Sequence, residues 1–125
     1  MVLLKTHSGV VVHGAAHGQK IGFPTINILA PGLDMDFGVY ACRVYTKNGT
    51  YKGAMHFGPR RIIQMMEPVL EIHLLDFSGD LYGQEVRIEI ISKIRATMDF
   101  KEMESLKKQI TIDVEAVRMV LENLD

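Results

Sequence analysis

EVRIEI, residues 85–90, alternates without a break between charged and apolar residues. Successive side chains of a β-strand point to opposite faces, so Val86, Ile88 and Ile90 face one way and the charged residues face the other. The segment therefore predicts a strand that is buried on one face and exposed on the other.

Similar short segments precede this strand along the chain. Runs rich in β-formers, separated by Gly, Pro, Asn and Asp, predict further strands at about 9–13, 25–29, 38–45, 50–57 and 69–74, and the alternating strand extends over 85–94. Between two of these runs, Lys47-Asn48-Gly49-Thr50 carries an Asn-Gly pair, which favours a two-residue hairpin turn because both central residues can adopt positive φ. This spacing is typical of a β-sandwich or barrel and not of a repeated βαβ unit.

After Asp99 the apolar period lengthens from two residues to three or four. The recurring residues are Met103, Leu106, Ile110, Val114, Val117, Val120, Leu121 and Leu124. They predict an amphipathic helical tail over about 99–124, which becomes a helix pair if Thr111 or Asp113 caps a second helix. No repeat, low-complexity stretch or linker interrupts the chain, so we expect one domain over residues 1–125, with the β-rich part at about 9–95.

Composition narrows the class of protein. The 125 residues are 47% apolar and 23% charged, with a formal net charge of −1, as in ordinary soluble globular proteins, and this balance argues against an extended nucleic-acid partner. No run of about 18 apolar residues and no export-signal pattern occurs, so we expect no membrane partner. The single cysteine, Cys42, lies in an alternating apolar run, which predicts that its thiol is packed in the core. A chain with one cysteine fits the reducing environment of the cytoplasm.

A glycine-rich segment precedes the second predicted strand. Gly14, Gly18 and Gly22 recur at four-residue intervals around Lys20. Backbone N–H groups in such a loop can approach an anion and the lysine adds a positive charge, so a phosphate cradle is one interpretation. The segment does not match the P-loop pattern, and an ordinary connecting loop is the alternative.

Two pairs of polar residues stand on predicted strands. Pro24 favours an extended entry into the strand, on which Thr25 and Asn27 share one face. A hydroxyl and an amide oxygen are hard donors that Mg²⁺ accepts together with water and substrate phosphates. Glu71 and His73 share a face of a later strand, where a carboxylate could act as a general base. Ordinary solvent-facing polar residues are the alternative for both pairs.

Two longer motifs occur in order along the chain. They are Gly22-Phe23-Pro24-Thr25-Ile26-Asn27 and Glu71-Ile72-His73-Leu74-Leu75-Asp76-Phe77, the second followed by Leu81-Tyr82-Gly83. With Gly14, Gly18, Gly38-Val39-Tyr40, Tyr51-Lys52-Gly53 and Ile94-Arg95, they resemble the riboflavin kinase family over about residues 9–116. The resemblance implies a mainly β protein: a six-stranded antiparallel Greek-key barrel with a C-terminal α-helix or helix pair.

The resemblance also implies an activity, transfer of the ATP γ-phosphate to the riboflavin 5′-hydroxyl to give FMN and ADP. It implies Mg²⁺ or another divalent cation held by Thr25 and Asn27, with Glu71 as the catalytic base. The nucleotide is expected to contact Gly14, Gly18, Lys20, Gly22, Pro24, Thr25 and Asn27, and the flavin to contact Phe77, Tyr82 and Arg95. The expected partners are these small molecules, bound by a monomer.

One segment departs from the family pattern. Pro59-Arg60-Arg61-Ile62-Ile63-Gln64 replaces the usual residues of the loop on the flavin side. This departure motivates an alternative, a non-catalytic flavin- or nucleotide-binding regulatory barrel; a purely structural or protein-interaction barrel is a third. In bacteria the family's module is commonly the C-terminal half of a bifunctional protein that also adenylylates FMN, and the sequence fits both a stand-alone enzyme and an excised module.

Overall fold

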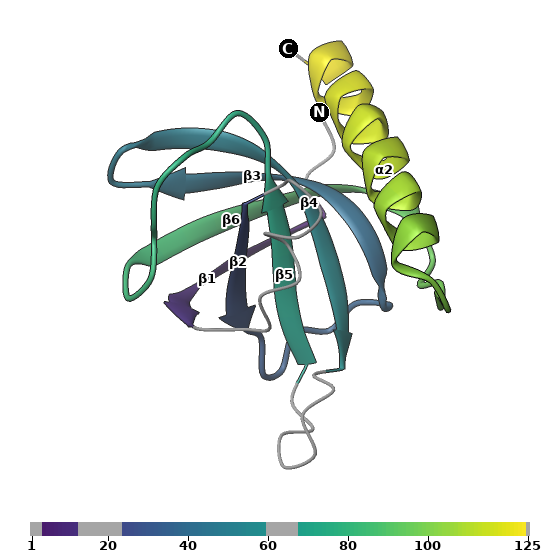
Figure 1. Ribbon diagram of the computed structural model, residues 1–125. Coiled ribbons are helices and arrows are strands. Elements are labelled where there is room, and N and C mark those ends of the chain that lie inside the picture. Colours follow the sequence, from purple (N-terminus) through teal and green to yellow (C-terminus); the bar gives the residue numbers. More distant parts are fainter. Residues whose placement is uncertain (1–3, 13–23, 60–67, 125) are drawn as a thin grey trace.

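Six antiparallel strands form a closed barrel, and a single helix follows them (Figure 1). The computed structural model describes residues 4–12, 24–59 and 68–124. The elements are β1 (Lys5–Val12), β2 (Thr25–Leu29), β3 (Gly38–Thr46), β4 (Gly49–Pro59), β5 (Pro68–Leu74), β6 (Glu85–Arg95) and α2 (Met103–Leu124). Around the barrel the order is β1-β2-β5-β4-β3-β6, and β6 returns beside β3 after the β3-β4-β5 meander, which is a Greek-key connection. The expected fold class is confirmed.

The main difference from the predicted strands is at β1, which begins at Lys5 and not at residue 9. Residues 5–10 pair with β6, from Lys5 opposite Ile90 to Val10 opposite Glu85. The outward-facing Thr6 is exposed, as is Ser8. Because a strand with a polar outer face still forms its backbone ladder, the apolar pattern alone underestimated its length.

The predicted hairpin between β3 and β4 is present, but its turn differs from the expected one. Thr46 pairs with Gly49, so Lys47 and Asn48 are the two loop residues. Among the described residues other than glycine, only Asp76 has a positive φ, and the positive φ of this turn falls on Gly49, at 141°. The Thr46 hydroxyl accepts a bond from the Asn48 N–H (3.0 Å) and donates one to the Gly49 carbonyl (2.9 Å), which stabilises this arrangement.

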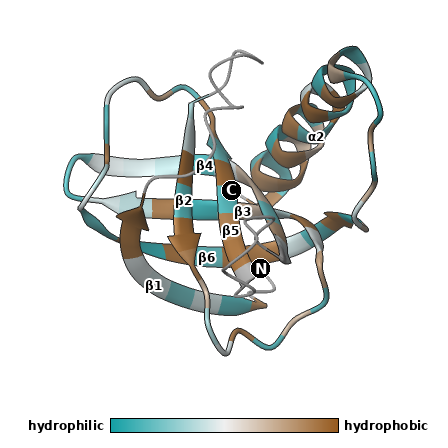
Figure 2. Ribbon diagram, turned by 60° about the horizontal axis from the view of Figure 1, so that its bottom comes forward, coloured by the Kyte–Doolittle hydropathy of each residue, from teal (hydrophilic) through white to brown (hydrophobic). Residues whose placement is uncertain are grey.

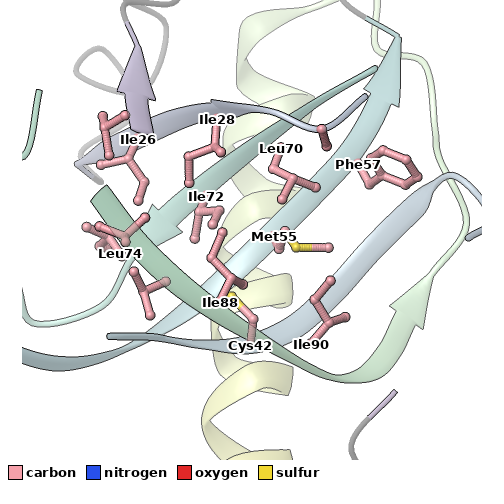
Figure 3. Packing of buried hydrophobic residues seen from close by; sticks show 14 of the residues in the cluster. Ile26, Ile28, Cys42, Met55, Phe57, Leu70, Ile72, Leu74, Ile88 and Ile90 are labelled. Atoms are coloured by element: carbon pink, nitrogen blue, oxygen red, sulfur yellow. The ribbon is translucent and has the colours of Figure 1, made fainter. Parts of the chain in front are cut away.

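Alternate residues of the strands fill the inside of the barrel (Figure 3). The largest fully buried side chains there are Phe57, Ile28, Met55, Leu70, Ile72, Leu74, Leu81, Ile88 and Ile90. Cys42 is also fully buried, with its Sγ 3.4 Å from the Gly53 carbonyl oxygen, and burial raises the pKa of its thiol. It packs as a small hydrophobic side chain, as the sequence predicts.

Helix α2 packs on the outside of the barrel and forms a second core. Its buried apolar residues Ile110, Val114, Val117 and Leu121 meet Ala41, Ala54, Leu75 and Ile91. Figure 2 shows hydrophobic stretches recurring along the helix between hydrophilic ones, as expected for an amphipathic helix. Met103 and Leu124, at the two ends of the predicted apolar stripe, are exposed.

The helix is continuous, so the suggested break near residues 111–113 is wrong. The Thr111 hydroxyl donates to the Lys107 carbonyl one turn earlier (3.1 Å), and the Asp113 carboxylate binds Arg95 instead of capping a helix. Within the described residues, no helix has the length and apolar character needed to cross a membrane.

The close packing between β3, β4 and β5 gives a test of the barrel interior. A Cβ atom added at Gly53 would lie 2.6 Å from Ile72 Cγ2 and 3.0 Å from Cys42 Sγ. We expect Gly53→Ala to reduce the free energy of unfolding by about 1–3 kcal/mol, because the buried side chains of Ile72 and Cys42 must shift. Urea unfolding measures the change, and Ser8→Ala, on the exposed side of β1, serves as a control within about 0.5 kcal/mol of the wild type.

Candidate active site

The outer face of the barrel carries the polar residues of the two sequence motifs. Ile26 of β2 and Ile72 of β5 point inward (Figure 3), so the residues next to them in sequence face outward. Asn27 lies opposite Glu71 in the β2–β5 ladder, and Thr25 lies opposite His73. Strand register thus brings two motifs that are about 45 residues apart in the chain onto one surface.

Strand β4 completes this surface on the other side of β5. His56 lies opposite Glu71, and Ala54 lies opposite His73. We call Thr25, Asn27, His56, Glu71 and His73 the outer polar patch. Because Ala54 is part of the core beneath α2, His73 lies at the border between the outer polar patch and the helix.

Burial differs sharply within the outer polar patch. The Glu71 side chain is 33% exposed, whereas that of His73 is only 8% exposed. Its Nε2 is 3.8 Å from Glu71 Oε1, which is longer than a hydrogen bond. Burial and, to a smaller extent, the nearby His56 lower the pKa of His73 to about 4, and the Asp113 carboxylate opposes this change. The imidazole is therefore neutral at pH 7, with one N–H donor and one acceptor nitrogen.

Arg95, predicted to bind flavin, forms a two-point ion pair that joins the end of β6 to α2. Its Nε and Nη2 donate to Oδ1 and Oδ2 of Asp113, both at 2.8 Å, and its Nη1 donates to the Ala96 carbonyl (3.0 Å). Gln109 Nε2 also donates to Asp113 Oδ1 (3.0 Å). The Asp113 side chain is 4% exposed and that of Arg95 16%. In this structure the guanidinium fixes the helix; a flavin contact stays a prediction.

The other two predicted flavin residues lie in the connection between β5 and β6. Phe77 packs edge-on against Tyr51, with ring centroids 4.9 Å apart and an interplanar angle of 77°, and it contacts the barrel core. Tyr82 is half exposed, and its backbone N–H donates to the Asp80 carboxylate (2.9 Å). Tyr82 therefore offers an accessible ring face, while Phe77 is largely committed to packing.

The same connection is joined to α2 by a second ion pair. Arg118 donates to both carboxylate oxygens of Asp76, at 3.0 and 3.2 Å. Asp76 adopts a left-handed φ of 57°, and these hydrogen bonds with the positive charge of Arg118 lower the pKa of its carboxyl group. The Asp76 side chain is 75% exposed, so this pair is much less buried than Arg95–Asp113.

Four predicted nucleotide-binding residues, Gly14, Gly18, Lys20 and Gly22, lie outside the described residues, as do residues 60–64 of the divergent loop. The fifth, Pro24, is described, and its carbonyl accepts a hydrogen bond from the Leu74 N–H (2.9 Å). This bond brings the chain just before Thr25 against the end of β5.

The outer polar patch suits a metal ion that takes most of its ligands from water and from the phosphates of a substrate. Within the described part of the chain, no group of three or more His, Cys, Asp or Glu side chains could hold a metal ion. Thr25 and Asn27 supply one hydroxyl and one amide oxygen on a single face, beside the Glu71 carboxylate. Such a small set of oxygens fits Mg²⁺, which retains water and binds substrate phosphates.

Two features of this region were missed in the sequence. One is the ion pair of Asp113, which falls among the apolar positions Ile110, Val114 and Val117; an acidic residue in such a stripe signals a buried ion pair. The sequence does place His73 beside Glu71 on one face, but it gives no signal that the His73 side chain is nearly buried.

The barrel, the helix packed against it and the outer polar patch define a barrel domain of the flavokinase type. The family model for riboflavin kinase matches residues 4–121. The chain therefore belongs to the riboflavin kinase family. A bifunctional riboflavin kinase/FMN adenylyltransferase of Haemophilus influenzae is 42% identical to it over 112 residues, which are 88% of this chain and 36% of that protein. The chain thus spans about a third of the length of this curated relative.

Solved structures agree on the fold. A Streptococcus pneumoniae protein described as a macrolide-efflux protein has a TM-score of 0.79 and 31% identity, over 90% of this chain and 38% of that one. A riboflavin kinase from Trypanosoma brucei has a TM-score of 0.64 and 26% identity, over 94% of this chain and 79% of that one.

The two ion pairs of α2 should contribute very differently to stability. Asp113→Asn leaves the guanidinium of Arg95 buried without its counter-charge, so we expect a loss of about 3–5 kcal/mol in the free energy of unfolding. Asp76→Asn, in the exposed pair, should change the free energy of unfolding far less, because water and salt screen that pair. Urea unfolding of both variants tests the contrast, and equal losses would contradict it.

Proposed function

We propose that this chain is a riboflavin kinase, an enzyme that transfers the γ-phosphate of ATP to the 5′-hydroxyl of riboflavin. The observation that carries this proposal is the pairing of Asn27 with Glu71, since it joins a candidate phosphate and metal site to a candidate base. Membership of the riboflavin kinase family supports the same activity. We further propose that the chain acts as a monomer in the cytoplasm, with riboflavin and ATP as its partners.

The reaction needs an in-line arrangement and a proton acceptor. The riboflavin 5′-oxygen forms a bond to the γ-phosphorus as the bond from that phosphorus to the β–γ bridging oxygen breaks, and ADP leaves. Glu71 accepts the proton of the hydroxyl. Phosphoryl transfer is catalysed largely by positioning and charge stabilisation, and a base is typically worth about 10² to 10⁴ in rate. A carboxylate that is one-third exposed can reach a substrate while its backbone is fixed in a barrel strand.

The phosphate groups would lie over the β2 side of the outer polar patch. Thr25 and Asn27 would hold the divalent cation, which would offset the charge of the transferred phosphoryl group. Pro24 and the glycine-bearing segment with Gly14, Gly18, Lys20 and Gly22 cover the nucleotide. We assign the flavin ring to surfaces that include Phe77, Tyr82 and Arg95, of which Tyr82 is the most exposed aromatic side chain.

The direct test is formation of FMN from riboflavin, ATP and Mg²⁺, followed by separation of the flavins. The wild-type chain should form FMN, and Glu71→Gln should lower kcat by roughly 10² or more with little change in riboflavin affinity, because the amide cannot take the proton. Riboflavin binding without FMN formation by the wild-type chain would favour the non-catalytic alternative. An unchanged kcat in Glu71→Gln would remove this residue from the mechanism.

Metal dependence tests Thr25 and Asn27 separately from the base. Thr25→Val and Asn27→Leu each remove one oxygen donor at similar size, so turnover at low Mg²⁺ should fall by at least roughly tenfold and recover in part at high Mg²⁺. Thr6→Val, which removes an exposed hydroxyl from the outer face of β1, is the matched control and should behave like the wild type. Equal Mg²⁺ dependence in all these proteins would exclude the proposed ligands.

A further inference from the structure

Glu71 has a buried neighbour that the proposed reaction does not yet use. His73 lies two residues further along β5 on the same outer face, and its Nε2 is 3.8 Å from Glu71 Oε1. The two side chains differ in exposure, 8% for His73 against 33% for Glu71. A nearly buried ring therefore lies beside a partly exposed carboxylate.

The neighbours of His73 come from two strands and the helix. Thr25 lies across the β2–β5 ladder from it, and Ala54 lies across the β4–β5 ladder, where the core beneath α2 begins. From the helix side, the Asp113 carboxylate is close enough to act electrostatically on the imidazole, and Arg95 with Gln109 fixes that carboxylate. The imidazole is nearly buried among these elements, so it has less freedom to move than the partly exposed side chain of Glu71.

A surface carboxylate is a poor base unless one of its oxygens is directed at the substrate. We infer that His73 is a positioning residue, whose Nε2–H holds Oε1 of Glu71 so that Oε2 is directed at the riboflavin hydroxyl. This inference rests on the proposed function, because it concerns the orientation of its base. A small rotation of the Glu71 side chain shortens 3.8 Å to a hydrogen bond, and a misplacement of about 1 Å can cost roughly 10² in rate.

A space-filling role for His73 makes a different prediction. Burying a polar ring has a cost in free energy, and an apolar side chain of similar size at such a site is generally neutral or stabilising. If His73 only filled space beneath the helix, a flexible apolar residue would replace it without loss of turnover. If His73 positions Glu71, the replacement must place an N–H group where Nε2 of His73 lies.

Methionine and glutamine provide a matched pair of replacements. They have similar length, but only glutamine carries an N–H group that can reach Glu71 Oε1. We expect His73→Met to lower kcat for FMN formation roughly ten- to a hundredfold with riboflavin KM nearly unchanged, and His73→Gln to recover most of this loss. Equal kcat in His73→Met and the wild type, or equal losses in the Met and Gln variants, would overturn the inference. If His73→Met does not fold, His73→Asn replaces it, since its shorter amide cannot reach Oε1 and should show the same loss.

A double-mutant cycle separates positioning from a general structural effect. In the Glu71→Gln background, His73→Met should lower kcat less than about twofold further, because the group it positions is already inactive. A full additional loss in that background would assign His73 a structural role. Absence of FMN formation by the wild-type chain would reject the proposed function itself. If Glu71→Gln is slow but His73→Met is as active as the wild type, only the role of His73 is rejected.

Discussion

Pairing of β1 with β6 is the contact on which the rest of the structure depends. It closes the sheet into a barrel, so the ladder has no free edge and each strand divides its side chains between an enclosed interior and an outer surface. Side chains such as Ile28, Leu70 and Ile88 fill that interior. The polar residues of β2 and β5 must therefore lie outside, and the register of the two strands determines which of them meet.

Helix α2 then divides the outer surface into two regions. Small residues on β3 and β4, Ala41 and Ala54, let the helix approach, and its apolar side covers Ile91 of β6. His73 lies beside the covered region and is nearly buried although it is on the outside of the barrel, and Asp113 of the helix acts electrostatically on its imidazole. The helix thus contributes to the site by changing the environment of a side chain on β5.

Local sequence patterns predicted most of the fold. The alternation in β6, the breaks between strands and the three-to-four spacing after Asp99 identified six strands and a helical tail, because each signal depends on neighbours in the chain. The length of β1 was underestimated, since its pairing with β6 depends on backbone groups that side-chain patterns do not report. The choice between one C-terminal helix and a helix pair stayed open because Asp113 resembled a cap, and its actual partner, Arg95, comes from another element.

Less of the candidate site than of the fold could be predicted from local sequence patterns. Period-two spacing placed Thr25 with Asn27 and Glu71 with His73, and family resemblance joined the two pairs. No local pattern contains the register that sets Asn27 against Glu71, the burial of His73 or the packing of Phe77 on Tyr51. All three features arise only when distant parts of the chain come together in the closed barrel. The assigned roles of the site residues stay predictions until turnover is measured.

The two ion pairs of α2 also differ in how firmly they attach the helix to the rest of the protein. Added salt screens the exposed Asp76–Arg118 pair but has little effect on the buried Arg95–Asp113 pair. Local opening at high ionic strength therefore begins in the C-terminal half of the helix, and amide protons there exchange with solvent before those near Asp113. Because Asp76 directly precedes Phe77, loss of this pair removes one attachment of the connection between β5 and β6, which Phe77 still holds to the barrel through Tyr51.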